Sequence, residues 1–285
     1  MDNPILCTYH KDCIDGTAAA AVVLRKYPQA LLFPLAHAYT TDDITQIEQR
    51  ITHDTQIFTV DCGLGVREFL KHSSPVTTID HHIGGKEQFE EFAGTHPHYT
   101  YIFDNEKSGS SLTWSTLFPD ESMPELVRYV EDGDLWRWHY GTDSKDVNNY
   151  LSMFRNDPQT MLLLIESDIS EIKQKGTILS QYADREIQNL IQVPPITLYI
   201  NNQTHTAYNI TQYESACGNI LAERQNSVAL LFMIKGQYVK FSIRSLDHQT
   251  PSALDIATVL GGGGHKNAAG ATIPLGEFLH MIQSS

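Results

Sequence analysis

One short stretch of the sequence places a carboxylate directly before two imidazoles, Asp80-His81-His82. The β-branched residues 77–79 precede it and glycines follow it, a composition typical of a buried strand that delivers ligands to a cleft. Carboxylate and imidazole together suit Mn, Co, Fe or Zn, whereas Mg²⁺ alone is usually held by carboxylates and water. The stretch therefore predicts a divalent metal site, although paired histidines are also common on surface loops.

Further side chains of this kind follow other predicted strands. The apolar segments 5–9 and 55–60 are interpreted as strands, and each leads through a polar loop into a predicted helix, 17–27 or 66–71. Repetition of strand, loop and helix predicts a doubly wound parallel sheet, an α/β fold in which ligands bind beyond the carboxyl ends of the strands. Any single aspartate there could equally be a helix N-cap, but several strands that end in such residues favour a metal site. The side chains at these strand ends are His10, Asp12, Asp15, Asp61, Asp80, His81 and His82.

A further aspartate would complete a binuclear site. The segment 125–131 is predicted as a helix, and Asp132 and Asp134 follow it with Gly133 between them. Either aspartate fits as a ligand, and the choice stays open at this point. In the alternative interpretation, Gly133 caps the end of the helix and the tryptophans that come next pack in the core.

The length of 285 residues favours two domains. We place a metal-binding parallel-sheet domain over 1–165 and a smaller α+β domain over 194–285. Between them, 166–193 is predicted as a helical connector, because a polar-rich helical pattern ends there at a pair of prolines. The second domain is expected to contain strands at 196–200, 206–210, 227–234, 238–243 and 271–273, with helices at 216–224, 253–260 and 275–283.

The second predicted domain carries a run of four glycines, 261–264, directly before His265. Such a run costs backbone entropy, which indicates positive φ or a close approach of the backbone to another group. Phosphate is a common partner because unhindered N–H groups can cradle it, although a flexible hinge would have the same composition. Arg244, at the end of a predicted strand, could grip phosphate in a bidentate way. We therefore predict substrate binding by Ser242, Arg244, Gly262, Gly263, Gly264 and His265.

Composition argues against some partners. The 20 Lys and Arg residues stand against 34 Asp and Glu residues, and the formal charge of −14 disfavours long duplex nucleic acid or an anionic membrane as a partner. A short phosphorylated ligand remains compatible with this charge. We expect no secretory signal and no membrane span, since the longest apolar run, 228–234, is too short to cross a bilayer. Four cysteines without CxxC spacing indicate reduced thiols and a cytoplasmic protein.

These motifs together resemble the DHH phosphoesterases that carry a C-terminal DHHA1 domain. Residues 80–82 match the motif that names the family, the loop 10–15 resembles its first motif, and Asp61 its second. Residues 242–245 (SIRS) and 261–270 (GGGGHKNAAG) resemble the DHHA1 signature. The first motif is most similar to the oligoribonuclease-like (nanoRNase) subgroup, whose pattern is H-x-D/N-C-x-D-G.

The resemblance implies manganese-dependent hydrolysis of phosphoester bonds in short oligonucleotides or small nucleotides, by water activated at two divalent ions. Asp80 would orient the histidines and His82 would face the phosphate, both in catalytic roles, while Arg244 and His265 would grip a phosphate or ribose. The family commonly has a single residue between the two aspartates of its first motif, whereas here they lie three positions apart, so the ligand role of Asp12 stays open. The implied ligands are His10, Asp12 and Asp61 for one ion, and Asp15, Asp61, His81 and Asp132 or Asp134 for the other.

Rival functions stay open as well. The same residues would suit a phosphatase of 3′-phosphoadenosine 5′-phosphate or a phosphodiesterase of cyclic nucleotides, because only the shape of the cleft separates these substrates. A nucleotide-binding regulator without catalysis is consistent with the irregular first motif, and it should retain fewer than two ions per chain. The substrate is expected between the two domains, and the oligomeric state, including a homodimer, is not determined by the sequence.

Overall fold

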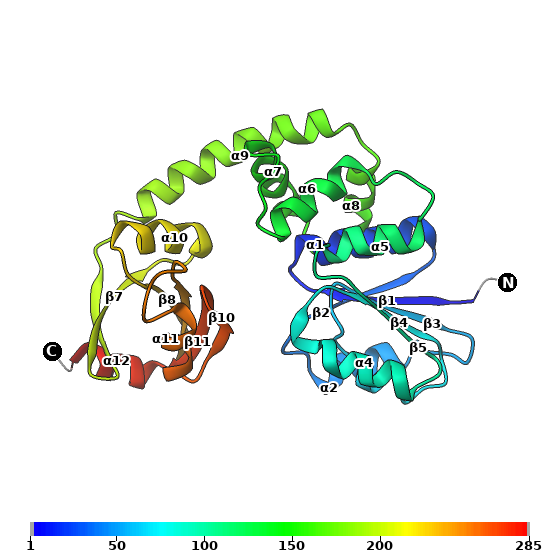
Figure 1. The fold of residues 1–285 in the computed structure, drawn as a ribbon, viewed down its shortest axis with the longest axis horizontal. Helices are drawn as coiled ribbons and strands as arrows, with labels where there is room; N and C mark the ends of the chain where they lie inside the picture. Colours follow the sequence, from blue (N-terminus) through cyan, green and yellow to red (C-terminus); the bar gives the residue numbers. More distant parts are fainter. Residues whose placement is uncertain (1–2, 284–285) are drawn as a thin grey trace. The chain divides into compact units, whose positions relative to one another are not determined.

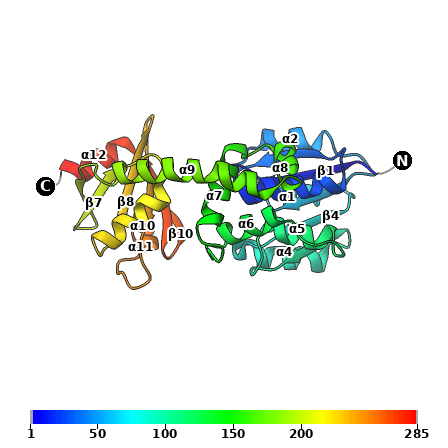
Figure 2. The same ribbon diagram turned by 90° about the horizontal axis from the view of Figure 1, so that it is seen from above.

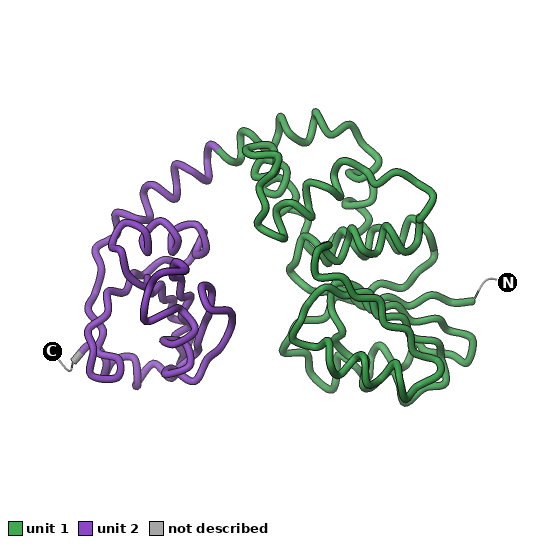
Figure 3. The backbone as a smooth tube through the Cα atoms, in the orientation of Figure 1, with its two compact units in different colours: residues 1–180 green, residues 181–285 purple. Residues whose placement is uncertain are grey.

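A computed structural model describes residues 3–283 of the chain. The chain divides into two compact units, unit 1 (1–180) and unit 2 (181–285), coloured green and purple in Figure 3. The division falls within α9 (Ile169–Leu190), which Figure 2 shows as one continuous helix. Each unit has its own sheet and its own hydrophobic core.

Unit 1 is built on a five-stranded sheet in which all neighbouring strands run parallel. The strand order is β2-β1-β3-β4-β5, so the direction of winding reverses between β1 and β3. Alternate side chains of β1 enter the cores on opposite faces of the sheet, Leu6 on one and Cys7 on the other. The strands are β1 (Ile5–His10), β2 (Leu31–Leu35), β3 (Gln56–Val60), β4 (Val76–Asp80) and β5 (Tyr99–Phe103).

Helices cover both faces of this sheet, as Figure 1 shows. One face packs against α1 and α5, with Ala19, Ala20 and Leu112 in the shared core, and the other face packs against α2, α3 and α4. The doubly wound α/β fold predicted from the sequence is therefore confirmed. The bounds are α1 (Ile14–Lys26), α2 (Thr41–Glu48), α3 (Val66–Phe69), α4 (Lys86–Thr95), which follows the short 3₁₀ turn η1 (Ile83–Gly85), and α5 (Gly109–Leu117).

A further helical layer packs on α1 and consists of α6 (Glu125–Asp134), α7 (Thr142–Leu151) and α8 (Pro158–Ile165), with η2 (Ser152–Phe154) between the last two. The sequence analysis did not predict α4, α7 or α8. It also ended α6 at residue 131, whereas the helix continues through Gly133. A Cβ on Gly133 would lie 2.3 Å from Asn148 Nδ2, so this glycine permits the close packing of α6 against α7 and does not cap the helix.

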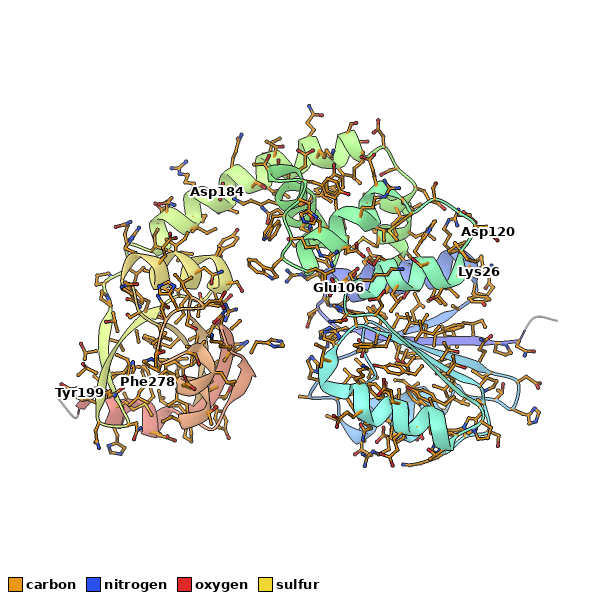
Figure 4. All side chains as sticks on the ribbon, in the orientation of Figure 1. Lys26, Glu106, Asp120, Asp184, Tyr199 and Phe278 are labelled. Carbon is orange, nitrogen blue, oxygen red and sulfur yellow. The ribbon has the colours of Figure 1, made fainter. Side chains whose placement is uncertain are left out.

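Unit 2 contains a six-stranded mixed sheet with the order β10-β11-β9-β8-β7-β6. Only β7 and β8 pair in parallel, and α10 connects them, as a parallel crossover requires. Phe278 of α12, labelled in Figure 4, packs against Phe232 and Phe241 of the sheet. The predicted α+β domain is confirmed. Its elements are β6 (Ile196–Ile200), β7 (Gln203–Asn209), α10 (Glu214–Arg224), β8 (Ala229–Lys235), β9 (Tyr238–Arg244), α11 (Ala253–Val259), β10 (Gly263–His265), β11 (Ala268–Pro274) and α12 (Leu275–Gln283).

Across the described residues 3–283, no helix combines the length and the apolar character needed to cross a bilayer.

Candidate metal centre

The candidate metal centre lies where the strand order of unit 1 reverses, between β1 and β3. In open parallel sheets such a switch point leaves a crevice beyond the carboxyl ends of the strands. His10 is the last residue of β1, and Asp61 follows β3 with a φ of +56°. The Asp61 carboxylate is 1% exposed, with Oδ2 3.5 Å from His10 Nδ1 and Oδ1 3.1 Å from His81 Nε2.

Two sets of three ligand atoms gather at this point, and within each set the atoms lie within 4.8 Å of one another. The short contact between Asp61 and His81 joins the two sets. Asp134 Oδ2 lies 3.6 Å from His81 Nε2, which brings the end of α6 to the strand ends. The sets are His10, Asp61 and His82, and Asp15, His81 and Asp134.

Three buried polar atoms of this centre have no hydrogen-bond partner in the part of the chain that the structure describes: His10 Nδ1, Asp15 Oδ2 and Asp61 Oδ2. A buried polar atom without a partner costs about 1–3 kcal/mol, so three in one place call for a physical explanation. Imidazole nitrogens and carboxylate oxygens are a donor set that suits Mn²⁺, Co²⁺, Fe²⁺ and Zn²⁺. The residues of this centre therefore fit divalent metal ions.

The N-terminus of α5 holds Asp15 in place. Asp15 Oδ1 accepts hydrogen bonds from Ser108 Oγ (2.7 Å), Ser110 N (3.1 Å) and Ser110 Oγ (2.5 Å), which leaves Oδ2 directed to the centre without a partner. Gly109 lies between the two serines, and a Cβ there would come within 2.6 Å of Asp61 Cβ. These serines were not among the predicted site residues, and in the sequence they appear only as a polar helix start after β5.

Asp80 lies against the two histidines that follow it. Its Oδ1 accepts from the backbone N–H groups of His81 (2.8 Å) and His82 (3.1 Å), and from His82 Nδ1 (2.7 Å). This is the orienting position expected for Asp80 from the family resemblance. Because Nδ1 of His82 is engaged, Nε2 is the nitrogen available to the set that contains His10 and Asp61. His82 was expected to face the phosphate, whereas the structure places it with candidate ligands.

The structure does not bring Asp12 or Asp132 into either ligand set. Asp12 has a φ of +60° and pairs with Asn156, whose Nδ2 donates to Asp12 Oδ1 at 2.5 Å. The carboxylate of Asp132 accepts from the backbone N–H groups of His139 (2.9 Å) and Tyr140 (3.3 Å) and from the Ser144 hydroxyl. Residues i and i+2 of a helix point in directions about 200° apart around its axis. When Asp134 faces the centre, Asp132 must therefore face away from it.

Burial and the repulsion between neighbouring carboxylates shift the pKa values of side chains in this centre. Burial raises the pKa of Asp134 to about 6, and the charge of Asp61 acts in the same direction. Burial also raises the pKa of Asp15 well above its ordinary value, again with the charge of Asp61. Burial lowers the pKa of His81, but its hydrogen bond with Asp61 and the surrounding carboxylates outweigh this and raise it to about 9. For Asp61 itself burial raises the pKa, but the imidazoles of His10 and His81 lead to a net lowering. In the protein without ions, a proton on His81 therefore offsets part of the crowded negative charge.

His37, which the sequence analysis did not consider, also lies at the centre. It follows β2, and its ring centroid is 4.8 Å from that of His10 in an edge-to-face arrangement. Burial lowers the pKa of His37, and the neighbouring imidazoles of His10 and His82 lower it further. In the sequence, His37 lies two residues beyond Leu35, the last residue of β2.

The predicted substrate residues of unit 2 have structural roles of their own. The run expected as an irregular phosphate loop contains the strand β10, which pairs with β11. A Cβ on Gly262 would lie 2.1 Å from the Gly270 carbonyl oxygen, so the close approach predicted for the glycines is made to β11. Arg244 donates to Ser215 Oγ (2.8 Å) and to the Ile243 carbonyl (2.9 Å). The remaining predicted residues lie nearby in the sheet: Ser242 pairs with Gly270, Gly264 has a φ of +140°, and Gly263 and His265 are exposed in β10.

Comparison with known proteins places this fold in a defined class. Residues 203–284 match the family model of the DHHA1 domain. Among solved structures, the chain is similar to an exonuclease RecJ bound to manganese, with 14% identity over 98% of this chain and 88% of that one, and a TM-score of 0.56. RecJ of Thermus thermophilus in complex with Mn²⁺ gives 16% identity over 98% of this chain and 51% of that one, with a TM-score of 0.59.

A phosphodiesterase has the same fold. The pGpG-specific phosphodiesterase PggH from Vibrio cholerae is 15% identical over 97% of this chain and 94% of its own, with a TM-score of 0.51. An uncharacterized protein, R106 of Acanthamoeba polyphaga mimivirus, is 24% identical over 218 residues, which are 71% of this chain. The match covers about half (49%) of that curated relative's length. The chain thus has the fold of these solved structures and carries a DHHA1 domain over residues 203–284, which confirms the resemblance found in the sequence.

Proposed function

We propose that this chain is a divalent-metal-dependent phosphoesterase that hydrolyses phosphodiester bonds of short oligonucleotides or small nucleotides. One observation carries the proposal: two sets of metal-type ligands meet at Asp61 and His81, and three of their buried atoms have no hydrogen-bond partner among residues 3–283. The names of the structural neighbours, a manganese-bound exonuclease and a phosphodiesterase specific for pGpG, support it.

Two ions, for which manganese is our first choice, would be held by the sets that contain Asp61 and Asp134. Bound there, such ions supply a water of lowered pKa and neutralise charge on phosphoryl oxygens. The chain's own contribution is to fix the ligands. Asp80 holds His82 in one tautomer and orientation, and the start of α5 holds Asp15. We propose that His37, whose ring lies beside that of His10, donates a hydrogen bond to a phosphoryl oxygen.

In unit 2 we keep Ser242, Arg244, Gly262, Gly263, Gly264 and His265 as proposed substrate contacts. Arg244 supports this assignment only in part, because its guanidinium already donates to Ser215 and Ile243. The edge strand β10 pairs on one side only, so its outer backbone groups are available to a ligand.

A chromatographic assay tests the proposed activity. Purified protein, loaded with Mn²⁺ or treated with chelator, would be incubated with a pool of pGpG, a five-residue RNA, 3′-phosphoadenosine 5′-phosphate and cyclic AMP. We expect Mn²⁺-dependent loss of pGpG or of the short RNA. Loss of only one of the other two would identify the corresponding rival activity. If nothing is hydrolysed and fewer than two ions are bound per chain, the protein is a regulator and the proposal is wrong.

A further inference from the structure

Two large aromatic side chains follow the proposed ligand Asp134 and are directed to solvent. Trp136 is 59% exposed and Trp138 is 37% exposed, and their ring centroids lie 5.4 Å apart at an interplanar angle of 89°. The alternative drawn from the sequence, that these tryptophans pack in the core, is therefore wrong. An exposed indole contributes little of the stabilisation that a tryptophan side chain gives when it is buried, so the presence of two here needs another reason.

The backbone at these two positions is also unfavourable. Trp136 and Trp138 both have a φ of +53°, in the left-handed region that bulky side chains rarely adopt. Conformations of this kind persist only where the surrounding structure imposes them, and they concentrate at functional sites. Two strained and exposed tryptophans, separated by one residue, therefore indicate a surface that has a function.

The surrounding structure does impose this conformation. Asp132 accepts hydrogen bonds from the backbone of His139 and Tyr140, which closes the loop over its own helix end. Between the tryptophans, the guanidinium of Arg137 donates to the carbonyl oxygen of Glu106 (2.7 Å) and to its carboxylate (3.2 Å). Glu106, labelled in Figure 4, lies in the loop between β5 and α5. The indoles thus stand on a loop that is fixed at both ends.

A cavity of about 310 Å³ adjoins the loop, and its lining includes Arg128, Arg137 and His139. Its two acidic residues are already engaged, Glu131 by Ser108 N and the Ser111 hydroxyl, and Asp132 by the loop backbone. Arg137 also lies 3.7 Å from Glu131 Oε1, and His139 Nδ1 lies 3.8 Å from Asp132 Oδ1. Arg128 is exposed and has no ion pair among residues 3–283, so it is the basic side chain of this cavity that is available to an anionic group of a ligand.

We propose that Trp136 and Trp138 form a platform on which a base of the substrate stacks, while Arg128 at the adjoining cavity contacts a phosphate of the same nucleotide. The inference rests on the proposed function and specifies its substrate class as nucleotides that carry a base. Every base has a π-face, so an indole platform binds bases with little sequence preference, and neighbouring guanidinium groups add to the attraction. Two residues of chain span at most about 7 Å, so the backbone of Trp136 lies within that distance of the backbone of the proposed ligand Asp134.

The test compares substrates with and without bases. The variants are Trp136→Leu, Trp138→Leu and the double variant, with Trp136→Tyr as a conservative replacement that keeps an aromatic plane. Leu163→Ala serves as a control, because Leu163 is an exposed apolar residue of unit 1 on α8. The substrates are pGpG and an analogue that has the same phosphates but tetrahydrofuran in place of both bases. Circular dichroism verifies folding.

We expect the leucine variants to raise KM for pGpG by on the order of tenfold with little change in kcat, and to leave hydrolysis of the baseless analogue unchanged. Trp136→Tyr should restore most of the affinity, and Leu163→Ala should behave as the unaltered chain. Equal losses on both substrates, or no loss on pGpG, would overturn the platform while leaving the phosphoesterase intact. A dimer that the leucine variants convert to monomer, without a change in KM, would instead assign the tryptophans to an interface between copies.

Binding measurements test the tryptophan platform independently of the proposed phosphoesterase activity. Calorimetry in Ca²⁺ measures the Kd of pGpG and of the baseless analogue without relying on turnover. If no substrate is hydrolysed but pGpG binds, and the leucine variants weaken that binding about tenfold, the platform stands and the phosphoesterase proposal falls. If pGpG is hydrolysed but the variants bind it as tightly as the unaltered chain, the reverse holds.

Discussion

The two regions that the sequence marked as chemical differ in how their polar atoms are satisfied. At the end of the unit 1 sheet, His10, Asp15 and Asp61 each keep a buried atom without a hydrogen-bond partner among the described residues. In unit 2, Arg244 has two acceptors and Gly262 packs against β11. Several buried ligand-type atoms without partners in one place favour a bound ion, whereas the unit 2 motif has a structural explanation whether or not it binds a ligand. The proposal of a binding site is therefore better supported in the first region than in the second, and both need experiment.

The largest expected effect comes from Asp61, which belongs to one ligand set and touches the other. We expect Asp61→Asn to reduce kcat by on the order of 10³-fold or more and to lower the bound metal, because one set loses its carboxylate and the other loses the negative charge beside His81. Turnover and metal content by plasma emission spectroscopy are the measurements. Normal turnover by a well-folded Asp61→Asn protein would remove the central assumption of the proposed centre.

A smaller effect is expected from the residues that hold Asp15. Ser110→Ala removes a hydroxyl and leaves the backbone donor of residue 110, and affinity for Mn²⁺ should fall about 10–100-fold, as is typical for partners of metal ligands. Ser115→Ala on the same helix is a matched control, because its hydroxyl donates only to the Ser111 carbonyl. Equal Mn²⁺ affinity of the two variants would mean that Asp15 needs no support from α5.

Replacement of Asp134 and replacement of Asp132 should have opposite effects on the number of bound ions and on the free energy of unfolding. Asp134→Asn should lose one ion per chain with little change in stability. Asp132→Asn should keep both ions but unfold more easily by about 1–3 kcal/mol, because it weakens the buried hydrogen bond from Ser144 and two partly buried ones from the loop backbone. Metal content and urea unfolding of each variant decide between them. If Asp132→Asn instead loses the ion, the assignment of the two aspartates must be exchanged.

This pair also illustrates what the sequence could and could not predict. The strand ends that carry His10, Asp61 and Asp80 were predictable, because apolar runs followed by polar loops define the sheet edge locally. The choice between Asp132 and Asp134 was not, because it depends on α6 continuing through Gly133, which only the packing of α7 explains. The partner of Asp12 lies 144 positions away, at Asn156, where no local pattern indicates it.

In the protein without ions, the candidate metal centre should make the stability of unit 1 depend on pH. The pKa of His81 is raised to about 9 and that of Asp134 to about 6, so both groups bind protons more tightly in the folded chain. A raised pKa gives stability that is present at low pH and lost as pH rises through the folded value. Chelator-treated protein should therefore melt at progressively lower temperature from pH 5 to pH 9.

Intrinsic fluorescence isolates this effect, since all three tryptophans, Trp114, Trp136 and Trp138, lie in unit 1. Saturating Mn²⁺ should flatten the dependence above pH 7, because cations take the place of the proton on His81. A melting temperature that rises between pH 5 and pH 9 in chelator would contradict the charge balance described for the centre.

The smallest effect concerns two neighbouring glycines of unit 2. Comparison of their alanine variants distinguishes a structural role of the glycine run from a role in substrate binding. Gly262→Ala places a methyl group 2.1 Å from a carbonyl oxygen and should destabilise unit 2 by about 1–3 kcal/mol, measured by far-UV circular dichroism. Gly263 has no atom within 4 Å of its Cβ position, so Gly263→Ala should leave stability within about 0.5 kcal/mol. If β10 holds a substrate phosphate, however, that methyl group intrudes on it, and we expect KM for pGpG to rise a few-fold. An unchanged KM for Gly263→Ala, with Gly262→Ala destabilised, would show that the glycine run serves the fold of unit 2 and that the metal centre of unit 1 alone deals with the phosphate.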